Sequence, residues 1–152
     1  MVKEVHADRA NEILDVINTS NYEAYHGMIP PEHFREPVLT EEELLEDFER
    51  MVFYGWESNG KIVGVSALQF LDKGVGRVRY VYILPGYQRQ GIGTALVTQV
   101  ERKAMETDLS KLKVLTVEKA DWAVAFYKKL GFRLAERIER PWGFDVFLEK
   151  EL

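Results

Sequence analysis

The sequence contains no cysteine among its 152 residues. Without cysteine, a disulfide framework, a thiolate zinc site and a cysteine nucleophile are all excluded. A basic excess is missing too, since 20 lysines and arginines face 25 aspartates and glutamates. The resulting net charge of −5 argues against a nucleic-acid partner, because neutralising phosphates requires a cationic surface. Long apolar runs are also absent, so we expect no signal peptide, no membrane span and a cytoplasmic protein.

Repeats, low-complexity tracts and long glycine- and serine-rich linkers are missing as well. Apolar residues nevertheless make up 46% of the chain, which suffices for one hydrophobic core. We therefore expect a single domain over residues 1–152. No spacing of histidine, aspartate and glutamate indicates a metal site.

Hydrophobic periodicity and turn residues divide the chain into helices and strands. Five helices are expected. The first begins after a cap at Asp8, a short one lies within 22–33, and the third begins at the capping box Thr40–Glu43. A long helix follows Gly91, and the last runs from a cap at Asp121 to Leu130 and is closed by Gly131. Strands are expected over residues 2–6, 52–57, 62–70, 77–84, 112–117, 132–138 and 144–148. This order predicts an α/β (α+β) fold with a mixed, mostly antiparallel sheet of six to seven strands, a central parallel pair and helices on both faces.

The segment that follows the strand 77–84 has the features of a phosphate-binding site. The turn Pro85-Gly86-Tyr87 leads to Gly91-Ile92-Gly93, which opens the long helix. The first N–H groups of a helix have no internal partner, and the helix dipole adds partial positive charge there. Glycine lets a diphosphate approach the bare backbone closely.

Glycines in this arrangement have three other interpretations. A P-loop needs Lys-Ser/Thr after its last glycine, whereas Thr94-Ala95 follows Gly93. A dinucleotide fingerprint needs another glycine where Leu96 stands, which disfavours a nucleotide-dependent oxidoreductase. The third interpretation is that Gly91 and Gly93 only allow close packing of the helix on the sheet.

The segment Gln88–Gly93 resembles the Gln/Arg-x-x-Gly-x-Gly/Ala signature of the GNAT superfamily of N-acetyltransferases. Val81–Pro85 and the later Ala125–Phe132 also match. The resemblance implies that acetyl-CoA is the co-substrate and that its pantetheine arm pairs with the main chain near Ile83 and Leu84. It also implies that pyrophosphate binds to backbone amides of Gln88, Arg89, Gln90, Gly91, Ile92, Gly93 and Thr94. Asn is common seven residues before the family's tyrosine, and this chain has Ala120 there.

The resemblance also assigns Tyr127 as a cofactor contact and as the general acid that protonates the departing thiolate. Candidates for the general base are Tyr80, Tyr82, Glu57 and Glu118, with strand alternation placing Arg79 on the face opposite Tyr80 and Tyr82. The acceptor is expected near Tyr22, Tyr25, His26, Glu139, Arg140 and Trp142. The prediction is an N-acetyltransferase that moves the acetyl group directly to a primary amine of a small metabolite, peptide or protein. A homodimer is compatible with the resemblance, since many members of the superfamily pair in this way. A non-catalytic acyl-CoA sensor is the alternative.

Overall fold

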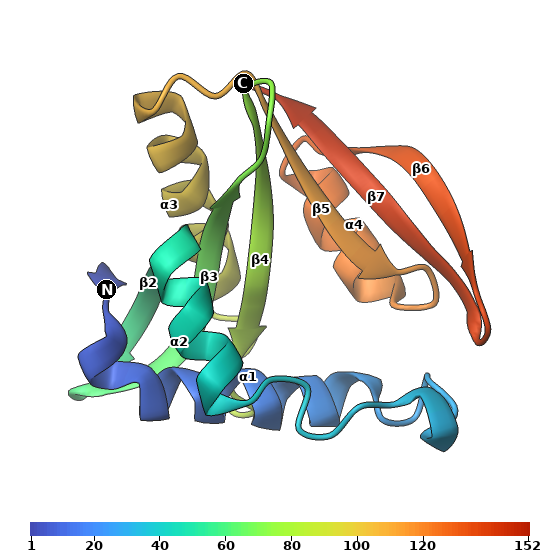
Figure 1. Ribbon diagram of the computed structural model, residues 1–152, viewed down its shortest axis with the longest axis horizontal. Coiled ribbons are helices and arrows are strands. Elements are labelled where there is room, and N and C mark those ends of the chain that lie inside the picture. Colours follow the sequence, from blue (N-terminus) through green and yellow to red (C-terminus); the bar gives the residue numbers. More distant parts are fainter.

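A single seven-stranded sheet runs through the computed structural model, which describes all of residues 1–152, in the order β1-β2-β3-β4-β5-β7-β6 (Figure 1). The strands are β1 (Val2–Val5), β2 (Met51–Ser58), β3 (Lys61–Phe70), β4 (Val75–Ile83), β5 (Lys111–Val117), β6 (Arg133–Arg140) and β7 (Gly143–Glu151). All neighbours are antiparallel except β4 and β5, which are parallel. The predicted fold class, including the central parallel pair, is therefore confirmed.

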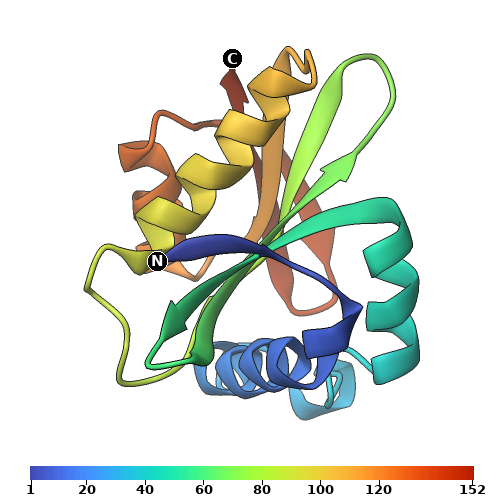
Figure 2. The same cartoon turned by 90° about the vertical axis from the view of Figure 1, so that its left-hand side faces the viewer.

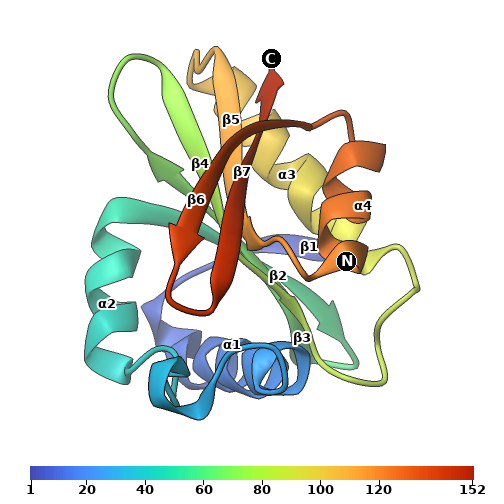
Figure 3. The same cartoon turned by 90° about the vertical axis from the view of Figure 1, so that its right-hand side faces the viewer.

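Two helices cover each face of this sheet. The α1 (Ala10–Tyr25) and α2 (Glu41–Arg50) helices lie on one face, and α3 (Ile92–Glu106) and α4 (Asp121–Lys129) lie on the other (Figures 2 and 3). Short 3-10 turns, η1 (Ala7–Arg9) and η2 (Pro31–His33), flank α1. The helices bury apolar stripes in the core, with Ile13 and Ile17 of α1 and Leu96 and Val100 of α3 fully buried. None of the helices is long and apolar enough to cross a membrane.

Local sequence signals explain several of the boundaries. Thr40 and Glu43 form the predicted capping box, because the Thr40 hydroxyl accepts from the Glu43 N–H while the Glu43 carboxylate accepts from the Thr40 N–H. The Asn59-Gly60 turn between β2 and β3 has φ values of +53° and +79°, as a two-residue hairpin of this kind requires. Gly131 closes α4 in the predicted left-handed conformation, with φ +98°.

The first helix is longer than predicted. It continues to Tyr25 as one element, whereas a separate short helix was expected to begin near Tyr22. Ser20 and Asn21 are buried on it, so the buried stripe continues with polar residues where the apolar pattern stops.

The two predicted aspartate caps are also wrong. The residue before α1 is Arg9, with Asp8 inside η1, and the residue before α4 is Ala120. Neither helix start carries a side-chain cap hydrogen bond. Asp121 is instead the first residue of α4, where its charge still complements the helix dipole.

The central strands β4 and β5 are paired over only part of their length. Val75–Val78 of β4 pair with Lys111–Val114 of β5, and pairing stops there. On its other side, β4 changes register between Arg79 and Tyr82, which oppose Ala67 and Val65 of β3. Two residues of β4 thus oppose one residue of β3, which defines a β-bulge. Beyond it the two central strands diverge, as Figure 1 shows.

Candidate active site

A cleft of about 940 Å³ opens where β4 and β5 separate. It extends from the C-terminal part of α1 on one face of the sheet to the start of α3 and to α4 on the other. Seven of the predicted site residues line it: Ile83, Gln88, Arg89, Gly91, Gly93, Thr94 and Tyr127. Leu84 and Ile92 are buried in the core behind the cleft, and Gln90 is exposed beside it. The structure therefore brings most of the predicted site together.

The start of α3 presents unpaired backbone donors to this cleft. Its first intrahelical hydrogen bond runs from the Ala95 N–H to the Gly91 carbonyl, and no side chain caps the helix. The N–H groups of Ile92, Gly93 and Thr94 consequently have no partner within the helix. Together with the helix dipole, these donors are suited to binding an anion.

The two glycines of this segment serve different purposes. Gly91 has φ +81°, and a Cβ placed on it would meet no atom within 4 Å, so its side faces open space. A Cβ on Gly93 would lie 3.2 Å from Ile83 Cδ1 and 3.3 Å from Phe126 Cζ. Gly93 thus allows α3 to pack closely against β4 and α4, as the packing interpretation requires. Gly91 is not needed for packing, because nothing lies opposite it.

Ile83 provides an unpaired main-chain donor at the edge of β4. The Leu84 N–H donates to the Val63 carbonyl of β3 at 2.9 Å. Because successive N–H groups of a strand point to opposite sides, the Ile83 N–H points toward β5 and into the gap. The Ile83 carbonyl accepts a hydrogen bond from the Gln88 side chain at 3.3 Å, which connects the strand edge to the turn before α3.

Tyr127 lies on α4 at the wall of the cleft and is only 6% exposed. Its ring packs edge-on against Phe126 and Phe132, with centroid distances of 5.0 and 5.5 Å. Burial raises the pKa of Tyr127 above its ordinary range, and the neighbouring Tyr25 and Tyr82 raise it further. The phenol is therefore protonated at neutral pH and can donate a hydrogen bond into the cleft.

Tyr80 and Tyr82 share one face of β4, as predicted. The Tyr80 hydroxyl donates to Asp47 of α2 at 2.6 Å, and the Tyr82 hydroxyl donates to Asn21 of α1 at 3.0 Å. Burial is the main reason that the pKa values of both tyrosines lie above the ordinary range. Arg79 was expected on the opposite face, but its guanidinium carbon lies 4.9 Å from the Tyr80 ring centroid. The bulge in β4 puts these neighbours on one side.

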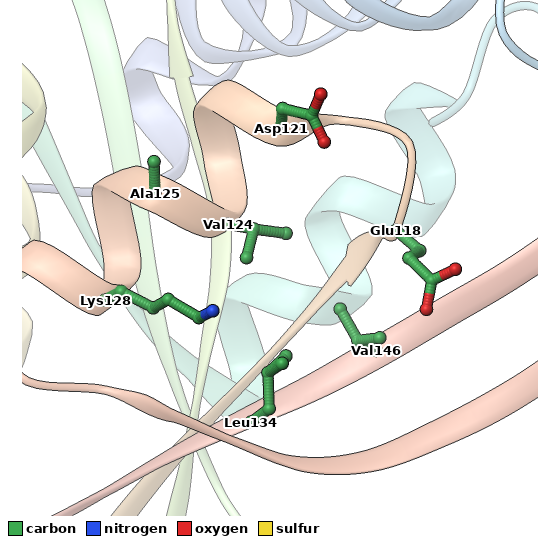
Figure 4. A pocket seen from close by; sticks show the side chains of 7 residues that line it. All are labelled: Glu118, Asp121, Val124, Ala125, Lys128, Leu134 and Val146. Atoms are coloured by element: carbon green, nitrogen blue, oxygen red, sulfur yellow. The ribbon is translucent and has the colours of Figure 1, made fainter.

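The two predicted carboxylate bases lie outside the cleft. Glu57 is at the end of β2, where it forms ion pairs with Lys3 and Arg9. Glu118 pairs with Arg137 of β6 and lines a smaller hollow of about 360 Å³ beside α4 (Figure 4). Neither side chain lines the cleft, so neither can receive a proton there directly.

Most of the residues predicted to meet the acceptor have other partners. Of the six, only Tyr25 lines the cleft, where its ring stacks on Trp122 of α4 at 6.2 Å. Tyr22 and His26 stack on one another, and Arg140 forms an ion pair with Asp145. The other two are Trp142, which packs against His33 at 5.8 Å, and Glu139, which is exposed on β6.

Several lining residues were not found from the sequence. Arg77 and Arg79 of β4 line the cleft, as do Ser20 of α1 and Thr116 of β5. Buried polar atoms of three of these, Ser20 Oγ, Arg77 Nε and Thr116 Oγ1, have no hydrogen-bond partner in the protein. One signal was available: two arginines at alternate positions of an otherwise apolar central strand put two cations on one face of the sheet.

Comparison with known proteins agrees with this arrangement. The model of the acetyltransferase (GNAT) family matches residues 14–132. The chain belongs to the GNAT family. The resemblance of the sequence to the GNAT superfamily is thereby confirmed.

Solved structures of the GNAT fold superpose over the whole chain. The PaiA N-acetyltransferase of Thermoplasma acidophilum, in complex with coenzyme A, has a TM-score of 0.86 at 18% identity, covering 100% of this chain and 98% of that one. The ribosomal-protein-S18-alanine N-acetyltransferase of Escherichia coli has a TM-score of 0.81 at 16% identity, covering 99% and 92%. At these identities the likeness establishes the fold.

Curated relatives match a shorter part of this GNAT-family chain. An acetyltransferase of Yersinia pseudotuberculosis is 31% identical over 82 residues, which cover 54% of this chain and 57% of the relative. The YdhI protein of Bacillus subtilis is 42% identical over 48 residues, 32% of this chain and 30% of that protein. The matched part thus spans less than two thirds of these relatives.

Proposed function

We propose that this GNAT-family protein is an N-acetyltransferase that moves the acetyl group of acetyl-CoA directly to a primary amine of a small metabolite or peptide. The observation that carries the proposal is the meeting of two sets of free backbone donors in one cleft. The N–H groups of Ile92, Gly93 and Thr94 begin α3, and the Ile83 N–H lies at the unpaired edge of β4. A ligand with a diphosphate and an amide-bearing arm fits such a pair of sites.

In this proposal the turn before α3 holds the pyrophosphate and the edge of β4 holds the pantetheine arm. The contacts would come from the main chain of Gln88, Arg89, Gln90, Gly91, Ile92, Gly93 and Thr94, with Ile83 beside the arm. The N–H and carbonyl of Leu84 are already paired with Val63 and Tyr87. The acyl group would then lie in the gap between β4 and β5, which connects the two faces of the sheet. The acceptor enters from the face that α1 and α2 cover, where Tyr25 and Tyr82 line the cleft.

The reaction requires a neutral amine, a donor for the oxyanion and a proton for the thiolate. Neutralising a lysine-like amine with a pKa of about 10.4 at pH 7 costs about 4.6 kcal/mol, so a proton acceptor is required. The Ile83 N–H points to where the oxyanion would form, and one such donor typically contributes about 2.7–4 kcal/mol. Tyr127 holds its proton at neutral pH and would donate it toward the departing thiolate.

Calorimetric titration with acetyl-CoA, and with NADH and ATP as controls, tests the cofactor. Micromolar affinity for acetyl-CoA alone corresponds to about −8 kcal/mol and is the expected result. Binding of NADH instead, or no binding of acetyl-CoA, would refute the assignment. Thiol release from acetyl-CoA in the presence of a panel of amines then tests turnover.

A non-catalytic acyl-CoA sensor is the second candidate. It is favoured by one observation: the only carboxylate that lines the cleft is Glu23, which is exposed, and no histidine lines it. Ala120, where asparagine is common in the family, is consistent with this alternative. A sensor would bind acetyl-CoA in the titration and release no thiol with any amine. The homodimer and the cytoplasmic location stay predictions.

A further inference from the structure

Arg77 and Arg79 differ from the other arginines of the chain in their partners. Five of the ten arginines form ion pairs with carboxylates: Arg9, Arg35, Arg50, Arg137 and Arg140. Three more are exposed to solvent: Arg89, Arg102 and Arg133. Arg77 and Arg79 alone are partly buried and have no carboxylate partner. Partly burying two unpaired cations costs free energy, which a bound anion would offset.

Arg79 is close enough to destabilise the positive charge of Arg77. Burial, and after it the positive charge of Arg79, lower the pKa of Arg77 to about 10. Arg77 is still charged at neutral pH, but its Nε has no hydrogen-bond partner and its guanidinium carbon lies 5.6 Å from the Phe147 ring centroid. Lys113 adds a third cation on the same ring, with Nζ 4.1 Å from its centroid.

The nearby carboxylates are already paired. Asp47 accepts from Arg50 and from the Tyr80 hydroxyl, and Arg79 approaches that hydroxyl at 3.5 Å while donating to Gln69 at 3.0 Å. Glu149 of β7 forms an ion pair with Lys111 at 3.1 Å. The guanidinium of Arg79 is thereby oriented by neutral partners and keeps free donors.

The arginines lie on the acceptor side of the sheet. Arg77 and Arg79 oppose Gln69 and Ala67 of β3 in register, so all four side chains share one face. The next residue of β3, Ser66, points the other way and donates to the Leu96 carbonyl of α3. The start of α3, where the pyrophosphate is proposed to bind, is therefore on the opposite face from the two guanidinium groups.

We propose that Arg77 and Arg79 bind a carboxylate of the acceptor, so that the substrate is an extended amine with a remote carboxylate. This inference rests on the proposed transfer of an acyl group at Ile83. Ile83 follows Arg79 by four positions of β4, and the bulge between them shortens the strand, so the amine and the carboxylate would lie at most roughly 13 Å apart. The planar guanidinium forks match carboxylates in two-point geometry. An extended tetrapeptide or an ω-amino acid of equal length has this separation, about 13 Å at 3.3 Å per residue.

Matched acceptors test the proposal in the intact protein with acetyl-CoA. Tetraalanine with a free C-terminus is compared with tetraalanine amide, and an ω-aminoalkanoate of the same length with its methyl ester. We expect kcat/KM to be at least tenfold higher for the free acids, mainly through KM. The ratio of kcat/KM for the free acid to kcat/KM for the neutral acceptor should fall toward one in Arg77→Gln and Arg79→Gln. A preference confined to tetraalanine identifies a peptide acceptor, and one confined to the ω-aminoalkanoate identifies an amino-acid-like metabolite.

Arg133→Gln is the matched control, because Arg133 is exposed, has no carboxylate partner and lies outside the cleft. It should keep the wild-type ratio, and Arg79→Lys should restore part of it. A wild-type ratio near one, or a ratio that survives both glutamine substitutions, overturns the carboxylate site. If no amine is acetylated, the proposed function fails by itself. Calorimetry with the protein and CoA then compares tetraalanine with its amide, and equal affinities overturn the arginine site independently of turnover.

Discussion

Replacing Gly91 with alanine, and comparing it with a matched glycine elsewhere, distinguishes an effect on cofactor binding from an effect of backbone strain on stability. Gly91 has φ +81°, and a Cβ there would contact no protein atom within 4 Å. The cost to stability is therefore conformational, about 1–2 kcal/mol for an L-residue in the left-handed region. Gly60 is the matched control, since its φ is +79°, its Cβ would also face open space, and it lies in the β2–β3 hairpin outside the cleft. Gly91→Ala and Gly60→Ala should lower the free energy of unfolding by similar amounts.

Their effects on acetyl-CoA affinity should differ. The open space beside Gly91 adjoins the free N–H groups of Ile92, Gly93 and Thr94, where a Cβ would hold the pyrophosphate away from the backbone. Losing one hydrogen bond to a charged group costs about 1.5–3 kcal/mol, so Kd should rise roughly 10- to 150-fold. Calorimetric titration measures this directly, with urea unfolding of the same samples as the stability control. A Kd within twofold of wild type for Gly91→Ala, or equal weakening by Gly60→Ala, would refute the proposed phosphate site.

Further predictions concern Tyr127 and the cap of α2. Tyr127→Phe should lower kcat at least tenfold and leave the Kd for acetyl-CoA nearly unchanged. The control is Tyr54→Phe, because Tyr54 is buried outside the cleft. Unchanged turnover in Tyr127→Phe would exclude Tyr127 as the acid. Because burial raises the pKa of Tyr127 above its ordinary value of about 10, no activity should be lost through this group below pH 10, as a pH–rate profile can show. Thr40→Ala should lower the free energy of unfolding by about 1 kcal/mol, because it removes the cap of α2. Thr98→Ala, on the exposed side of α3, is the control and should not lower it by this amount. Equal losses for both variants in urea unfolding would contradict a stabilising role of the cap. Glu43, whose pKa is lowered to about 2 by Arg35 and then by Thr40, stabilises the fold above pH 5 and loses this effect as pH falls toward 2. The Tm difference between wild type and Glu43→Gln should shrink over that range, and a constant difference would disprove the linkage.

The strands and their order were predictable because their boundaries rest on local chemistry. Asn59-Gly60 and Thr40–Glu43 determine their own backbone geometry through positive φ and reciprocal hydrogen bonds. The position of the proposed phosphate site was predictable for the same reason, because Gly91 and the free N–H groups of a helix start depend on local sequence. The length of α1 was not predictable from apolar periodicity, because Ser20 and Asn21 continue its buried side with polar groups.

The part of the cleft that faces α1 and α2 depends on tertiary structure, which explains the wrong predictions there. Strict alternation placed Arg79 and Tyr80 on opposite faces of β4, but the bulge against β3 puts them on the same side. No glycine or proline in β4 near Tyr80 indicates this bulge in the sequence. In the sequence, Glu57 and Glu118 lie on or beside predicted strands near the expected cleft. In the fold their arginine partners, Arg9 and Arg137, hold them outside the cleft.

The short pairing of β4 with β5 has a consequence for the mechanics of the molecule. The sheet consists of an antiparallel half, β1 to β4, and a second half, β5 to β7, and between the two only Val75–Val78 pair with Lys111–Val114. A ligand whose arm bonds to both strand edges beyond Val78 would lengthen this junction and couple the two halves. Part of its binding free energy would then appear as resistance to their separation. Amide hydrogen exchange in β5 and β7, as well as in β4, would slow when the cofactor occupies the cleft. The bound cofactor would thus stabilise the sheet as an added strand does, and its release would remove that stabilisation.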